Sequence, residues 1–135
     1  MIQRIQSVYL FLAFILDGTL FFNALYGHAM DDPQAWIGIG FTAVLIIAGL
    51  FSLVCIFLYS NRSNQIKWTG AALALQTIAL GYGVGILISL GGFGAFLWDE
   101  AIGAGILFIA LLAVYMARKK IKDDQELVRS MDRIR

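Results

Sequence analysis

Four long apolar runs are the feature that most restricts how this chain can fold. They cover residues 5–26, 37–59, 68–90 and 101–117. A helix crosses the hydrocarbon core of a bilayer with about 20 apolar residues, because each residue rises about 1.5 Å. Backbone polar groups in lipid must be bonded within the protein, and these runs lack the alternation of barrel strands. The sequence therefore predicts an all-α, integral membrane four-helix bundle.

Short connections join the runs, so residues 1–135 are expected to form one membrane domain without a linker. The fourth run is short for a span, and its helix is expected to begin nearer Phe96 or to tilt little. A tail of residues 118–135 follows it. Only 14% of the chain is charged, against about a quarter in soluble domains. Little of the chain is therefore left for a soluble domain.

The distribution of positive charge predicts the topology. All ten Lys and Arg residues lie before the first run, between the second and third, or after the fourth. The other two connections carry only the acids Asp31, Asp32, Asp99 and Glu100. By the positive-inside rule both termini are cytoplasmic, which four spans also require. The first run also resembles a signal peptide, but its length and its internal Asp17 favour a retained span.

Asp17 lies in the middle of the first run, where an unpaired carboxylate is costly. Counting residues from the inner ends of the first and third runs places Gln76 and Thr77 at the same depth. We therefore expect these two helices to touch there, with Asp17 within hydrogen-bond reach of Gln76 or Thr77.

Two interpretations of this intramembrane polar cluster remain open. The acid could relay a proton or cation, as intramembrane acids often do. It could instead join two helices, either protonated or hydrogen-bonded, or face another subunit. The runs contain no second ionisable residue and no polar path is expected beyond the three residues, which favours the second interpretation.

The third run ends in a glycine-rich stretch, LGYGVGILISLGGFGAF, at residues 80–96. Its GYG resembles a potassium filter, but a filter needs a re-entrant loop behind a pore helix. Close helix packing through Gly81 and Gly85, with Gly83 adjacent, is the favoured interpretation. A loosened helix end is expected at the three later glycines, Gly91, Gly92 and Gly94.

No motif in the chain predicts catalysis. The HAMDDP stretch, residues 28–33, offers one imidazole and two acids, and a solvated turn is expected there rather than a metal site. Hydrolase-type motifs, phosphate loops and paired-cysteine metal motifs are missing from the sequence. We expect no enzyme activity, cofactor, metal, nucleic-acid partner or soluble small-molecule substrate.

The tail combines a basic cluster with an apolar stripe. The basic cluster is Arg118, Lys119, Lys120 and Lys122, which anchors the topology and could contact anionic lipid. One helical stripe contains Ile121, Val128, Met131 and Ile134, with Leu127 at its edge. Either a short cytoplasmic helix docks through this stripe on the bundle or on another protein, or the tail is a solvated extension of the fourth helix.

Three stretches carry a likeness to a known family: MIQRIQ at the start, IFLYSNRSNQIKW between the second and third runs, and LVRSMDRIR at the end. They resemble a family of small four-helix inner-membrane proteins of Bacteroidota, catalogued as a domain of unknown function. The resemblance implies the fold, the topology and a place in the bacterial inner membrane, and it transfers no catalytic residue. Members usually carry an apolar residue at the position of Asp17.

These observations lead to two hypotheses of function. In the first, the chain is a non-enzymatic accessory or structural subunit of a larger inner-membrane complex, with other integral membrane proteins and membrane lipid as partners. In the alternative, it is a small proton-coupled transporter that acts as a dimer through Asp17, by analogy with other short four-span transporters.

Overall fold

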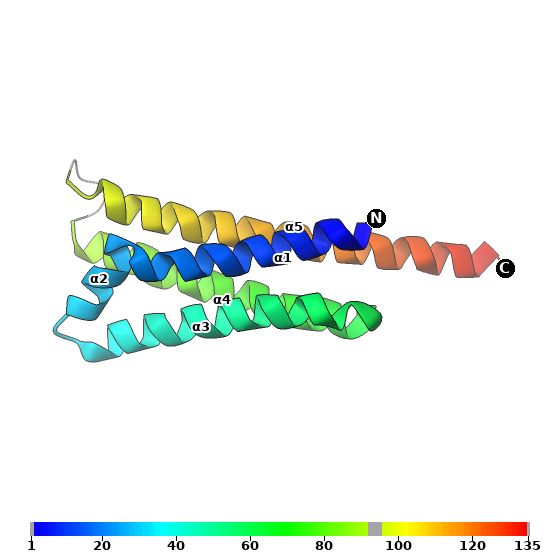
Figure 1. Ribbon diagram of the computed structural model, residues 1–135, viewed down its shortest axis with the longest axis horizontal. Coiled ribbons are helices and arrows are strands. Elements are labelled where there is room, and N and C mark those ends of the chain that lie inside the picture. The colour runs from blue at the N-terminus through cyan, green and yellow to red at the C-terminus, as the bar shows by residue number, and fades with distance from the viewer. Residues whose placement is uncertain (1, 92–95, 135) are drawn as a thin grey trace.

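The computed structural model describes residues 2–91 and 96–134, and every regular element in that part of the chain is a helix. The four long helices are α1 (Ile2–Thr19), α3 (Ala35–Phe57), α4 (Arg62–Ser89) and α5 (Trp98–Ile134). They run alternately in opposite directions, with both termini at one end of the bundle (Figure 1). Four helical stretches are long and apolar enough to cross a membrane. The predicted all-helical bundle of four spans is confirmed.

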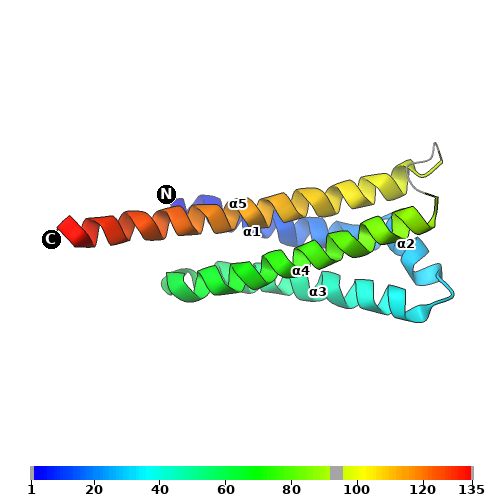
Figure 2. The same cartoon turned by 180° about the vertical axis from the view of Figure 1, so that it is seen from behind.

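Neighbouring helices in the bundle are antiparallel. Helix α1 packs against α3 and α5, and α4 packs against the same two helices. Helices α1 and α4 therefore run in the same direction and face each other diagonally across the core (Figures 1 and 2). The expected contact between the first and third spans is consequently made by side chains that reach across the centre, rather than by two helices packed side by side.

Three apolar clusters fill the interior in order along its length. The α2-end cluster comprises Leu20, Leu25, Ala29, Phe41, Leu45, Ala79, Ile86 and Leu107. The middle cluster comprises Ala13, Ala72, Ala113 and Val114. The tail-end cluster comprises Leu10, Cys55 and Ala117. The middle cluster is mostly alanine, and small side chains let helices approach closely at that level.

The sequence predicted one helix over residues 5–26, and this prediction was wrong at its end. Helix α1 ends at Thr19 and passes through a 3-10 turn, Leu20–Phe22. Asn23 then adopts extended backbone angles (φ −93°, ψ 150°), and its Oδ1 accepts a hydrogen bond from the Leu25 amide at 2.9 Å. A side chain that caps the next helix in this way competes with continuation of the previous one.

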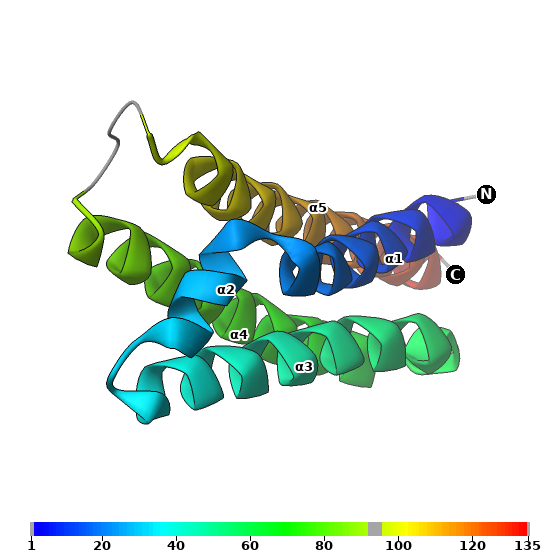
Figure 3. The same ribbon diagram turned by 60° about the vertical axis from the view of Figure 1, so that its left-hand side comes forward.

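The short helix capped by Asn23 is α2 (Ala24–Asp31). It crosses the end of the bundle and contacts α3 and α5 (Figure 3). This end, called the α2 end below, lies opposite the two termini (Figure 1).

The ends of the third span also differ from those predicted from the sequence. Helix α4 begins at Arg62, six residues before the predicted start, and Asn61 caps it by accepting from the Asn64 amide. It contains the GYG motif in continuous helix. The turn after α4 uses Gly91 at φ +112°, a value that favours glycine, whereas the expectation for Gly92 and Gly94 lies outside the described residues.

Helix α5 begins at Trp98, near the start expected for the fourth span, and continues without a break to Ile134. Of the two alternatives for the tail, the extension of the fourth helix is the one that the structure contains (Figure 1). The tail therefore projects from the bundle in line with the last span.

Candidate functional site

The centre of the bundle holds a buried polar pair. Gln76 Nε2 on α4 donates a hydrogen bond to Asp17 Oδ1 on α1 at 2.7 Å. The Asp17 residue is 2% exposed and Gln76 is fully buried. Of the two partners expected from depth, Gln76 therefore makes the contact. Thr77 is exposed, and its hydroxyl donates to the Leu73 carbonyl of its own helix at 2.9 Å.

Helix α3 forms the wall beside this pair. A Cβ atom placed on Gly49 would lie 3.8 Å from Asp17 Cβ and 3.5 Å from a ring carbon of Phe14. The Asp17 side chain thus lies close to the α3 backbone. A residue larger than alanine at position 49 would compete with Asp17 for this space.

Two oxygen atoms of the pair lack a hydrogen-bond donor among the described residues. In the part of the chain that the structure describes, Asp17 Oδ2 and Gln76 Oε1 have no hydrogen-bond partner. Both atoms are acceptors while Asp17 is ionised. One proton on the carboxyl would supply a donor, so the chemistry that this site can perform by itself is to hold a proton.

Apolar layers lie on both sides of the pair along the bundle. Along α1, Asp17 lies between Ala13 of the middle cluster and Leu20 of the α2-end cluster. Along α4, Gln76 lies between Ala72 and Ala79 of the same two clusters. The hydrogen-bonded pair therefore connects α1 and α4 between these two clusters.

The core holds polar side chains beyond the three residues that were predicted from depth. Further polar side chains are buried at Gln6, Ser52, Gln65, Thr69 and Glu100. Gln65 Nε2 donates to the Cys55 carbonyl of α3 at 2.9 Å, and the Thr69 hydroxyl donates to the Gln65 carbonyl at 2.8 Å. Spacings of four and seven residues place Gln65, Thr69 and Gln76 on one helix face. That signal was missed because residue 65 was assigned to the connection before the third span.

Two polar contacts join the α2 end of the chain to α5. His28 Nε2 lies 2.8 Å from Glu100 Oε1, and Asn23 Nδ2 donates to the Asp99 carbonyl at 3.1 Å. The imidazole thus faces α5 rather than Asp31 or Asp32. Within residues 2–91 and 96–134, no group of three His, Cys, Asp or Glu side chains has the arrangement of a metal site.

The tail keeps contact with the bundle only over its first part. Ile121 is buried, and Asp124 forms an ion pair with Arg62 at the start of α4, with 3.2 Å between Oδ2 and Nη2. The apolar residues that follow are exposed by 40 to 86%. These four, called the tail stripe, are Leu127, Val128, Met131 and Ile134.

The basic cluster divides into buried and exposed members. Arg118 is half-buried beside Gly70 of α4, where a Cβ atom on the glycine would lie 3.2 Å from the guanidinium. Lys119 and Lys122 are exposed and Lys120 is half-buried. Lys119 and Lys122 are therefore the exposed members of the cluster.

The two glycines expected to pack against another helix face outward. A Cβ atom on Gly81 or Gly85 would meet nothing within 4 Å. One on Gly83 would lie 2.5 Å from Leu107 Cδ1 of α5. Within this chain the packing role predicted for the first pair therefore belongs to Gly83.

Comparison with known proteins places the chain in a family without assigning an activity. A family model matches residues 27–134, a segment that begins in α2 and includes Gln76 and most of the tail but not Asp17. Neither the curated proteins nor the solved structures give a match. The matched segment covers most of the chain, and the chain belongs to the family described as a domain of unknown function, DUF4293.

Proposed function

We propose that this small membrane protein is a non-enzymatic accessory subunit of a larger inner-membrane complex. The observation that carries the proposal is the tail stripe. Ten residues of α5 follow the Arg62–Asp124 ion pair, and as a helix they extend about 15 Å further. Apolar residues at spacings of one, three and four along a helix are the pattern with which helices bind grooves of other proteins.

The buried pair supports the same proposal. A relay needs water to reach the acid from both sides, whereas towards the α2 end Asp17 and Gln76 adjoin the apolar α2-end cluster. The alternative, a proton-coupled transporter acting as a dimer, is supported by the carboxyl oxygen of Asp17 that has no hydrogen-bond partner among the described residues. Both hypotheses can be tested on the same purified protein.

We expect Met131→Asp to reduce recovery of co-purifying membrane proteins by at least about tenfold, the equivalent of about 1.4 kcal/mol, because it puts a charge in the middle of the tail stripe. Arg129→Asp is the matched control, since it places the same side chain on the opposite face of the same helix. Recovery is measured by quantitative mass spectrometry after extraction in mild detergent. Equal recovery for both variants would contradict the proposal.

We expect Asp17→Asn to leave partner recovery unchanged, because an amide can still hydrogen-bond to Gln76. A proton-coupled transporter would lose transport in this variant, since asparagine cannot take up and release the proton. Transport in proteoliposomes and partner recovery are measured in parallel. Lost transport in Asp17→Asn, together with normal recovery in Met131→Asp, would reverse the ranking of the two hypotheses.

We also propose that the tail end of the bundle faces the cytoplasm. Its support is the charge pattern: no Lys or Arg lies in the two connections at the α2 end. A cysteine at Asp31 should then react with an impermeant thiol reagent in intact cells, and one at Ser130 only after permeabilisation. The native Cys55 is fully buried and provides the unreactive background. Labelling of both positions from the same side would contradict the topology.

A further inference from the structure

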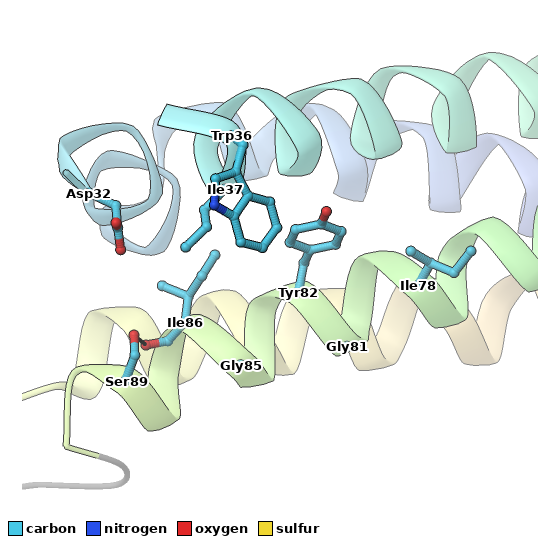
Figure 4. A pocket seen from close by; sticks show the side chains of 9 residues that line it. All are labelled: Asp32, Trp36, Ile37, Ile78, Gly81, Tyr82, Gly85, Ile86 and Ser89. Atoms are coloured by element: carbon cyan, nitrogen blue, oxygen red, sulfur yellow. Dashed lines mark hydrogen bonds between the residues drawn. The ribbon is translucent and has the colours of Figure 1, made fainter. Parts of the chain in front are cut away.

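A groove lies between α3 and α4 at the α2 end. Its volume is about 520 Å³, within the range of small-molecule sites. Its polar residues, Asp32 and Ser89, gather at the end nearest α2, and Ile78 lies at the opposite end (Figure 4). The groove is thus amphipathic along its length, with an apolar body and one polar end.

The sequence builds this groove from two glycines and two aromatic rings. Gly81 and Gly85 lie on the α4 side, where the missing side chains leave open space. Tyr82 reaches across to α3, and its hydroxyl occupies the space that a Cβ atom on Gly40 would take. Trp36 is 63% exposed, and its Nε1 donates to Gln34 Oε1 at 3.0 Å, which orients the indole beside Tyr82 (Figure 4).

The polar end of the groove has negative character. Asp32 lines it, and its Oδ1 accepts from the Gln34 amide at 2.8 Å within the turn. Ser89 donates its hydroxyl to the Ile86 carbonyl. The two connections at this end contain acids and no Lys or Arg. A head group that ends in a cation is therefore favoured there over an anionic head group without one.

We propose that the groove is a binding site for a phospholipid with an ammonium head group, of the phosphatidylethanolamine type. One acyl chain lies over Gly81 and Gly85, where it fills space that would otherwise lack packing contacts. The ammonium group lies beside the Asp32 carboxylate and the Trp36 indole, which attract a cation by charge and by the ring face. The acyl chain thus meets the apolar part of the groove, and the ammonium group meets its acidic end.

The test is reconstitution in bilayers of equal phosphatidylethanolamine and phosphatidylglycerol, followed by mild extraction and native mass spectrometry. The natural protein is expected to retain one phosphatidylethanolamine in preference to phosphatidylglycerol. Gly85→Leu fills the groove and is expected to reduce this retention about tenfold or more, since several buried methylene contacts are lost. Gly105→Leu is the matched control, because Gly105 is also an exposed glycine with open space around it, on α5.

A second pair of variants tests the polar end without altering the helices. Asp32→Asn is expected to lower the preference for phosphatidylethanolamine about two- to fivefold, the range of exposed ion pairs. Asp31→Asn, a change at the exposed neighbour outside the groove, should leave the preference unchanged. Equal retention of both lipids by the natural protein, unchanged retention in Gly85→Leu, or a second copy of the chain in place of the lipid would each overturn the proposal.

Discussion

Gln76→Leu is expected to lower the free energy of unfolding by about 3 kcal/mol, because it leaves the buried Asp17 carboxyl without its donor. The double variant Asp17→Leu, Gln76→Leu should recover most of this loss, since it removes both polar groups and keeps side chains of similar size. Reversible unfolding in mixed detergent micelles, followed by circular dichroism, gives the three free energies.

Thr77→Val provides the control for this measurement. Thr77 is the neighbour of Gln76, it is exposed, and its hydroxyl bonds only to the Leu73 carbonyl of its own helix. Its replacement should change stability by less than about 0.5 kcal/mol. A Gln76→Leu protein as stable as the natural one would mean that Asp17 has another donor. The hydrogen bond from Gln76 to Asp17 would then not be what stabilises the centre of the bundle.

Gly103→Ala is expected to destabilise the protein by about 1–3 kcal/mol through overpacking. Its new Cβ atom would lie 2.9 Å from Leu25 Cβ and against the Asn23 side chain. The Asn23 amide cannot move away without loss, because its Oδ1 caps α2 and its Nδ2 bonds to the Asp99 carbonyl. The change therefore damages the junction of α1, α2 and α5.

Gly105→Ala, two residues further along α5, tests whether the effect belongs to that junction. A Cβ atom there meets nothing within 4 Å. Since alanine is favoured over glycine within a helix, this variant should be neutral or more stable by up to about 1 kcal/mol. Thermal unfolding of both variants in the same detergent measures the difference. Equal loss in the two variants would show that the junction is not the cause.

Features that follow from length and depth could be predicted from the sequence. The constant rise of a helix made it possible to count from the span ends and place Gln76 level with Asp17. The four spans followed from the lengths of the apolar runs. Both predictions depend on one-dimensional distances along the membrane normal.

Features that depend on tertiary contacts were not predicted. Asn23 looks like one polar residue near the end of a span, and the Asp99 carbonyl that accepts from its Nδ2 lies 76 residues away in the sequence. Gln65 was assigned to the connection before the third span, and its burial followed only from the start of α4 at Arg62. Neighbour relations among the helices, including the diagonal placement of α1 and α4, have no counterpart in hydropathy.

That diagonal placement has a mechanical consequence. Four parallel rods joined only to their neighbours can shear from a square cross-section to a rhombus while every side keeps its length. A tie along one diagonal fixes the angle. The hydrogen bond from Gln76 to Asp17 is such a tie, since it joins α4 to α1 across the centre rather than along a side. Loss of this hydrogen bond should leave four intact helices whose cross-section skews more easily, because only the apolar contacts across the core would then resist it.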